Sequence, residues 1–197
     1  MQHKLFDDTE QLLLPEDLLT YTPEFITREE GNRLLELLLP IVPWQQHKDM
    51  MYEKEIIRPR LTAWYGDLRK RDEGKRQALP WLPELYALKQ RVEQYTGISF
   101  QGVLLNYYRD GNDSVAWHAD KDTVPGLKTD IASLSIGQER HFDFRHKEDH
   151  RLKHSIKLEH GSLLLMKAAL QKDWEHRIAK SSIPMKARIN MTFRKVF

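Results

Sequence analysis

The chain has 197 residues, 40% of them hydrophobic, which is enough to build the core of a single domain. It contains no cysteine, which excludes a disulfide framework and a thiolate metal site, so any transition metal would be held by His, Asp and Glu side chains. The 31 basic and 29 acidic residues give a formal net charge of +2, a balance that neither requires nor excludes a nucleic-acid partner.

The N-terminal segment, MQHKLFDDTEQ, is polar and acidic and lacks the apolar region of a secretory signal. No later segment approaches the roughly 20 apolar residues of a membrane span. We therefore expect a protein with no membrane partner, in the cytoplasm or elsewhere inside the cell, and in the nucleus if the source is eukaryotic. Because no repeat, low-complexity segment or long linker divides the chain, we expect one domain over residues 1–197.

Two segments have the pattern of amphipathic helices. Thr27 and Glu30 have the spacing of a capping box ahead of a leucine-rich series, and Pro40 ends that segment. The second segment covers residues 83–95, with apolar residues on one stripe and Gly97 as the stop. We expect both segments to form helices that precede the rest of the fold.

Beyond Gly97 the periodicity changes to that of short strands, and Asp110-Gly111 is a turn signal after the first of them. The segments with strand character are 103–108, 131–137, 141–145, 155–158, 162–166 and 189–193. Short strands at close intervals after two N-terminal helices predict an α+β protein built on a β-sandwich or jelly roll.

His118 and Asp120 are two residues apart, so on an extended strand both side chains leave the same face and can converge on one ion. A face of two histidines and one carboxylate with open positions is the arrangement of non-heme Fe(II) oxygenases. The third ligand would come from one of the downstream histidines, which are His141, His146, His150, His154, His160 and His176. Judged from this spacing alone, a solvated polar pair is the simpler interpretation.

The C-terminal segment offers a second polar face. On a strand, Arg188, Asn190, Thr192 and Arg194 share one side while apolar residues occupy the other. Two inward arginines would need anionic partners because unpaired buried charge is costly, and a dicarboxylate cosubstrate would supply them. The alternative is an edge strand whose arginines face solvent.

A set of polar motifs runs through the second half of the chain: Asn106-x-Tyr108, Asp110-Gly111, His118-x-Asp120-x-Asp122, His176 and Arg188-x-Asn190-x-Thr192-x-Arg194. Longer phrases accompany them, namely PRLTAWYGD at 59–67, IASLSIG at 131–137, FRHK at 144–147 and HGSLLLM at 160–166. Together these residues resemble the AlkB family of Fe(II)- and 2-oxoglutarate-dependent dioxygenases, and most of all its animal DNA- and RNA-repair branch. The resemblance covers roughly residues 40–197 in the family's order, which sets residues 1–40 apart as a variable N-terminal extension.

The resemblance implies a double-stranded β-helix, or jelly-roll, core with the N-terminal helices packed on one sheet. It implies a monomeric oxidoreductase that uses Fe(II), 2-oxoglutarate as cosubstrate and dioxygen. His118, Asp120 and His176 would be the catalytic iron ligands, the last chosen through the phrase DWEHRI. His160, in a turn before Gly161, would have a structural role.

The same resemblance assigns the 2-oxoglutarate contacts. Asn106 and Tyr108 would hydrogen-bond the cosubstrate, Arg188 would pair with its distal carboxylate, and Arg194 would sit near the end that chelates iron, with Asn190 close by. The implied reaction is oxidative demethylation of N-alkylated bases, 1-methyladenine and 3-methylcytosine, in DNA or RNA, as in DNA alkylation repair. Formaldehyde and the unmodified base would be the products.

Substrate contacts are expected at several further positions. Asp122 is placed to contact the cationic base, although it could equally be solvated or paired with a lysine. Trp64 and Tyr65, with Gly66 beside them, are candidates for the pocket that stacks a flipped base, unless they pack in the core. Arg145, with the two residues after it, could contact phosphates or form a solvated strand end.

Met51 and Tyr52 lie where a hairpin tip is expected, and apolar residues between charged ones there suggest a wedge that opens base steps. One departure concerns the loop Leu68–Arg76, which is basic where relatives have a tyrosine-rich stretch. A basic loop favours phosphate contact, or simply a solvated surface, over base stacking. The departure leaves open an Fe(II)/2-oxoglutarate enzyme that acts on a protein or small molecule. A sandwich-type binding module is the non-enzymatic alternative, and it would need neither the ligand face nor the paired arginines.

Overall fold

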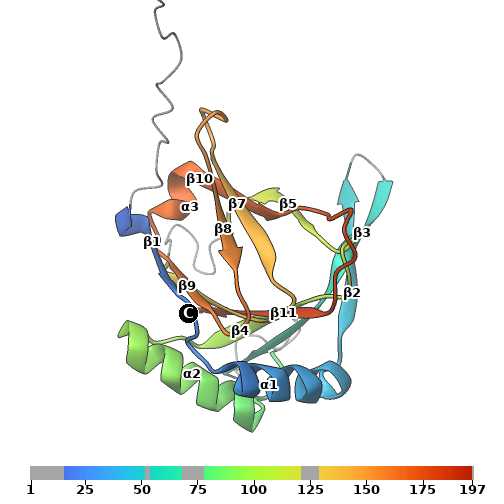
Figure 1. Ribbon diagram of the computed structural model, residues 1–197, viewed down its shortest axis with the longest axis vertical. Coiled ribbons are helices and arrows are strands. Elements are labelled where there is room, and N and C mark those ends of the chain that lie inside the picture. The colour runs from blue at the N-terminus through green and yellow to red at the C-terminus, as the bar shows by residue number, and fades with distance from the viewer. Residues whose placement is uncertain (1–15, 52–53, 68–77, 121–128, 197) are drawn as a thin grey trace, which may run out of the picture.

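The computed structural model describes residues 16–51, 54–67, 78–120 and 129–196. Two antiparallel sheets face each other, and the helices α1 and α2 lie side by side across the outer face of the larger one (Figure 1). This arrangement confirms the predicted α+β jelly roll with N-terminal helices packed on one sheet. In this part of the chain no helix is both long enough and apolar enough to cross a membrane.

The larger sheet has the strand order β1-β9-β6-β11-β4-β3-β2. Its strands are β1 (Leu19–Thr22), β9 (Leu163–Met166), β6 (Ile131–Gly137), β11 (Arg188–Arg194), β4 (Gly102–Tyr108), β3 (Lys54–Gly66) and β2 (Gln45–Met51). The smaller sheet has the order β5-β10-β7-β8. Its strands are β5 (Val115–His118), β10 (Trp174–Ile178), β7 (Arg140–His146) and β8 (Lys153–Leu158).

The helices begin and end close to where local signals predict. In α1 (Arg28–Ile41) the hydroxyl of Thr27 accepts a hydrogen bond from the backbone N–H of Glu30, and the helix ends one residue after Pro40. The second long helix, α2 (Pro83–Thr96), ends at Gly97, whose φ of 70° suits glycine. Two shorter elements complete the set, the 3-10 turn Glu16–Leu18 and α3 (Leu170–Asp173).

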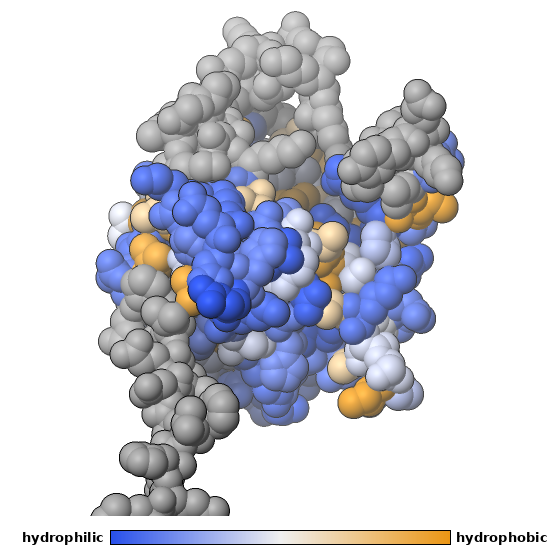
Figure 2. Space-filling view, turned by 90° about the horizontal axis from the view of Figure 1, so that it is seen from above, coloured by the Kyte–Doolittle hydropathy of each residue, from blue (hydrophilic) through white to orange (hydrophobic). Residues whose placement is uncertain are grey.

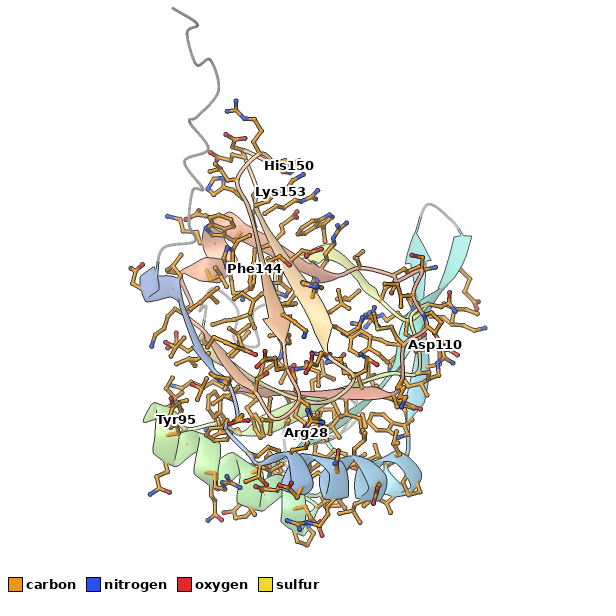
Figure 3. All side chains as sticks on the ribbon, in the orientation of Figure 1. Arg28, Tyr95, Asp110, Phe144, His150 and Lys153 are labelled. Atoms are coloured by element: carbon orange, nitrogen blue, oxygen red, sulfur yellow. The ribbon has the colours of Figure 1, made fainter. Side chains whose placement is uncertain are left out.

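Two hydrophobic cores hold the layers together. One lies between the helices and the larger sheet, where Leu38 and Leu88 pack against strand residues such as Leu105 and Ile189. The other lies between the two sheets and includes Phe144, which Figure 3 labels there. Because strand side chains alternate, each central strand of the larger sheet contributes to the helix-side core with one face and lines the space between the sheets with the other.

The sequence pattern missed the short strands β1, β5 and β10, and of the long hairpin β2–β3 it indicated only the tip near Met51. Residues 1–40 are predicted to be a variable N-terminal extension, and within them β1 pairs with β9 and most of α1 packs against the larger sheet. These elements are part of the packed fold, whereas the variability of the segment in sequence stays a prediction. The described face in Figure 2 is largely hydrophilic, with hydrophobic residues in small separate patches, and so offers no broad apolar docking surface.

Candidate metal and cosubstrate site

Three side chains with metal-binding atoms meet between the two sheets. His118 ends β5 and His176 lies directly opposite it on β10, while Asp120 follows β5 by two residues. Their ligand atoms all lie within 4.8 Å of one another, and the two imidazole centroids are 4.4 Å apart. Within the described ranges this is the one cluster of its kind, and it consists of the three proposed iron ligands.

The environment favours the protonation states that bind a metal. Burial raises the pKa of Asp120, but the positive charge of Arg194 and the two imidazoles outweigh this and lower it to about 2. Burial also lowers the pKa of His176 to about 4, against the opposing effect of the Asp120 carboxylate. At neutral pH the site therefore presents a carboxylate and a neutral imidazole, the forms that coordinate a divalent cation.

A row of polar side chains continues from the metal-ligand cluster along β11. Arg194 Nη2 donates to Asp120 Oδ1 over 2.6 Å, which joins the two motifs that the sequence places far apart. Asn190 and Thr192 are buried on the same face of the strand, and Arg188 lies at its far end. The arginine strand, as we call β11, is thus central in the larger sheet and its polar face points inward. This excludes the alternative of an edge strand whose arginines face solvent.

Arg188 has the geometry of an anion receptor. Its side chain is fully buried, Nη2 donates to the Ser135 hydroxyl over 2.9 Å, and Nε and Nη1 have no partner. Its guanidinium carbon lies 5.1 Å from the centroid of the Tyr108 ring. Burial lowers its pKa to about 10, and a buried guanidinium with two unpaired donors is costly unless an anion accepts from it. A carboxylate fits here, since an edge of the planar guanidinium presents two parallel N–H groups, one of them on Nη2, to its two oxygens.

The remaining cosubstrate candidates are two residues on β4 and one, Asn190, on β11. Asn106 and Tyr108 lie on β4 beside β11, and Asn106 Oδ1 accepts a hydrogen bond from Arg60 Nε over 2.9 Å. The sequence analysis missed Arg60 as a contact, although it stands in the phrase PRLTAWYGD. Asn190 is already engaged, because its amide donates to the Ser133 hydroxyl and to a backbone carbonyl and accepts from Thr192. These bonds order the face between the two arginines.

The aromatic pair of β3 separates onto opposite faces. Trp64 lies opposite Leu104 on the inner face, and its ring fills the space over Gly102, which pairs with Arg194. Its neighbour Tyr65 is 3% exposed and belongs to the helix-side core. We therefore correct the assignment of Tyr65 to the substrate pocket, because its ring points away from the metal-ligand cluster.

Gly66 is the last residue of β3, and its contacts are made by its backbone. Its N–H donates to the Leu79 carbonyl, and an added Cβ would lie 2.7 Å from the Gln101 carbonyl oxygen. The glycine is thus required by a close approach of two backbone segments. A substrate contact at Gly66 stays a prediction.

Arg145 lies on the outer face of the smaller sheet, behind the strand that carries His176. Its Nε and Nη2 both donate to Glu175 Oε2, and its guanidinium stacks 4.4 Å from the Trp117 ring. The guanidinium of Arg177 lies 4.5 Å from the centroid of the same ring, so Trp117 packs against two arginines on the face of the sheet opposite His118. The guanidinium of Arg145 thus faces away from the metal-ligand cluster and is paired with Glu175, and a contact with backbone phosphates stays a prediction.

The other predicted positions have the following outcomes. His160 has the structural role assigned to it, since Nδ1 accepts from the Gly137 N–H and Nε2 bonds to the Arg28 carbonyl. The other four histidines do not belong to the metal-ligand cluster; they are His141, His146, His150 and His154. Among these, His150 lies in the turn between β7 and β8 (Figure 3). β2 and β3 pair as far as Met51, as a hairpin there requires. Asp122, Tyr52, the side chain of Met51 and the loop Leu68–Arg76 lie outside the described residues.

Comparison with known proteins agrees with this geometry. The family model of the 2OG-Fe(II) oxygenase superfamily matches residues 18–194. The alkB homolog 3 dioxygenases of Rattus norvegicus and Homo sapiens are 40% and 39% identical to the chain over 185 residues, which is 89% of this chain. The chain spans 63% and 65% of the length of these two relatives.

Two further likenesses extend this result. The DNA oxidative demethylase ALKBH2 of Bos taurus is 38% identical over 149 residues, which is 70% of this chain and 53% of that protein. The solved structure of OsALKBH1 superposes with a TM-score of 0.59 at 17% identity, covering 90% of this chain and 98% of that one, and so supports the fold. Since the family match includes the metal-ligand cluster and the arginine strand, the chain belongs to the 2OG-Fe(II) oxygenase superfamily, and within it to the AlkB family.

Proposed function

We propose that the protein is an Fe(II)- and 2-oxoglutarate-dependent dioxygenase that removes methyl groups from N-alkylated bases in DNA or RNA. The observation that carries this proposal is the buried Arg188 with two unpaired donors, on the inner face of the larger sheet, whereas the cluster of His118, Asp120 and His176 belongs to the smaller sheet that faces it. Relatives named as alkB homolog 3 and as the DNA oxidative demethylase ALKBH2 support the substrate class. We further propose that the protein acts inside the cell as a monomer.

The metal-ligand cluster fits Fe(II). Two imidazoles and one carboxylate occupy one side of the ion in non-heme Fe(II) oxygenases and leave positions open for a cosubstrate. His118, Asp120 and His176 would hold the iron in this way. When bound with 2-oxoglutarate and dioxygen, the iron supplies the oxidation of the N-alkyl carbon, which leaves as formaldehyde while the cosubstrate becomes succinate and carbon dioxide.

The protein's own part is binding and orientation. Arg188 would receive the distal carboxylate of 2-oxoglutarate, and the Tyr108 ring beside it limits where that carboxylate can lie. Arg194 donates to Asp120 Oδ1, which fixes the carboxylate in position, and its positive charge helps to keep that carboxylate ionised. Asn106, held by Arg60, would orient the cosubstrate between them.

The substrate end of the site is proposed to include an aromatic residue, a carboxylate and a wedge. Trp64 is the inner-face aromatic side chain at the end of the sheet where Arg194 meets Asp120, so it is the described candidate for stacking on a flipped base. Asp122 is proposed to contact the cationic base. The wedge at Met51 and Tyr52 is proposed for duplex opening.

The test is a substrate panel with two product measurements. Succinate and formaldehyde are measured with methylated single-stranded DNA, duplex DNA, RNA and a methylated peptide, each with added Fe(II) and 2-oxoglutarate. We expect formaldehyde from one or more nucleic acids and none from the peptide, and we expect His118→Ala to abolish both products. Formaldehyde from the peptide alone would favour the protein-directed alternative that the basic loop Leu68–Arg76 leaves open.

A further inference from the structure

The backbone of Asp120 is held by a buried side chain from a distant part of the chain. Asp120 lies beyond the end of β5, outside any strand, yet its N–H donates to Gln171 Oε1 over 2.9 Å. Both residues are buried, with exposed fractions of 9% and 2%. Since Arg194 binds the carboxylate of the same residue, Asp120 is fixed at its side chain by one partner and at its main chain by another.

The backbone of Gln171 is connected to two strands of the smaller sheet, β10 and β7. It belongs to the short helix α3, which leads directly into β10 and so into His176. Lys147, at the end of β7, donates from Nζ to the carbonyl oxygens of Gln171 and Lys172 over 2.9 and 2.7 Å. These contacts hold the backbone of Gln171, and its amide Nε2 lies 4.0 Å from Met166 Sδ, so the residue is placed by contacts outside the metal-ligand cluster.

We infer that Gln171 is a positioning residue for the metal-binding carboxylate of Asp120, and that Lys147 acts on the metal site through Gln171. Without the amide oxygen, the Asp120 N–H would be a buried donor with no acceptor, and the backbone after β5 would shift to find one. Such a shift moves the carboxylate away from His118 and His176. The inference rests on the proposed metal site, so its test must separate a failure of that site from a failure of Gln171 to act on it.

The main comparison uses Gln171→Met and Gln171→Glu. Methionine keeps the length of the side chain and removes the acceptor, whereas glutamate keeps an acceptor oxygen. Gln138→Met is the matched control, because Gln138 Oε1 also accepts a backbone N–H, from Lys186 over 3.2 Å, at a turn outside the metal-ligand cluster. Co(II) binding to the apo-protein is followed by its visible absorption, which reports on coordination geometry without turnover.

We expect Gln171→Met to weaken Co(II) binding by about 10- to 100-fold, the range seen when partners of metal ligands are removed, and to change the Co(II) spectrum. Gln171→Glu should restore the affinity, and Gln138→Met should leave it unchanged. Thermal unfolding of the apo-proteins accompanies each titration. Wild-type affinity in folded Gln171→Met would overturn the inference, as would an equal loss in Gln138→Met. Absence of Co(II) binding that depends on His118 in the wild-type protein would instead overturn the metal site itself.

The part played by Lys147 has its own test. Lys147→Met should weaken Co(II) binding less than Gln171→Met does, and the double variant should be no weaker than Gln171→Met alone, because both changes act on one contact. Losses that add in the double variant would show that Lys147 does not act through Gln171.

Discussion

Replacing Arg188 by methionine should separate what this residue does for the cosubstrate from what it does for the fold. The change removes the charge and its donors and keeps much of the volume of a side chain that is 1% exposed. If two of its N–H groups bind a carboxylate, each charge-assisted bond contributes about 1.5–3 kcal/mol, or about 3–6 kcal/mol together. That loss corresponds to a rise of roughly 10²- to 10⁴-fold in the dissociation constant for 2-oxoglutarate.

The stability of the protein without cosubstrate should change in the opposite sense. The variant loses the bond to the Ser135 hydroxyl and the contact with Tyr108, but it also loses a buried charge whose Nε and Nη1 have no partner. Apolar replacements of buried charged groups are often neutral or stabilising by about 1–4 kcal/mol. We therefore expect Arg188→Met to unfold in urea with a free energy equal to or above that of the wild type.

The assay pairs calorimetric titration of 2-oxoglutarate into the Co(II)-loaded protein with urea unfolding of the apo-protein. Arg91→Met is the matched control, since Arg91 pairs with Glu30 at the surface, far along the chain from the site, and should leave 2-oxoglutarate binding unchanged. Co(II) affinity of Arg188→Met should also stay near the wild-type value. Unchanged 2-oxoglutarate binding, or a marked loss of apo stability, would refute the view that Arg188 is an unoccupied anion receptor.

Three further outcomes follow from the contacts outside the site. Gly31→Ala should lower the free energy of unfolding in urea by about 1–3 kcal/mol, because the new Cβ meets the His160 ring, which its own hydrogen bonds hold in place; a stabilised variant would contradict this. Burial raises the pKa of Asp113, but hydrogen bonds from Arg109 lower that pKa by more, so the net shift is downward from 3.8. The stabilisation is then present above 3.8 and lost as the pH falls through the folded-state pKa, so the deficit of Asp113→Asn in urea unfolding should be largest near neutral pH and shrink in acid. Trp117→Ala should lower the free energy of unfolding by about 1–2 kcal/mol, since two cation–π contacts of about 0.5–1 kcal/mol each are removed; a loss below about 0.3 kcal/mol in the same assay would mean that these two contacts contribute little.

Local signals predicted the helices well because their ends are fixed by nearby residues. The Thr27–Glu30 cap and the glycine at position 97 act within one turn of the helices that they bound. The strands β1, β5 and β10 were not predicted, because they have only 4, 4 and 5 residues and are held by partners distant in sequence. β10 does alternate between buried and half-buried residues, but one of its inward side chains is His176, which breaks the hydrophobic pattern.

The metal-ligand cluster was predictable to different degrees for its three members. Strand periodicity places His118 and Asp120 on one face but does not distinguish a metal site from a solvated polar pair, and His176 was chosen from six histidines only through the family resemblance. Its pairing with His118 is a register between strands 58 residues apart (176 − 118 = 58), which local periodicity does not encode. Gln171 carried no signal at all, because a single glutamine in a four-residue helix matches no pattern.

The aromatic pair of β3 shows what periodicity can and cannot decide. Adjacent strand residues must point to opposite faces, so Trp64 and Tyr65 could never both line one pocket. Which of them faces inward depends on the register with β4, where Trp64 lies opposite Leu104 and Tyr65 opposite Val103. That register is a property of the assembled sheet, and it assigns Tyr65 to the core.

The arginine strand explains why the site is harder to predict than the fold that contains it. β11 lies between β6 and β4, and such a central strand is expected to be apolar on any face that it buries. Its helix-side face obeys this expectation, with Ile189, Met191 and Phe193 all in the core. Its inner face instead buries Arg188 and Asn190, and we expect the unpaired donors of Arg188 to lower the stability of the protein without cosubstrate and to bind an anion. Residues that conflict with the folding pattern of their own strand are therefore the best sequence-level guide to this site, and the predicted stability of Arg188→Met measures the size of that conflict.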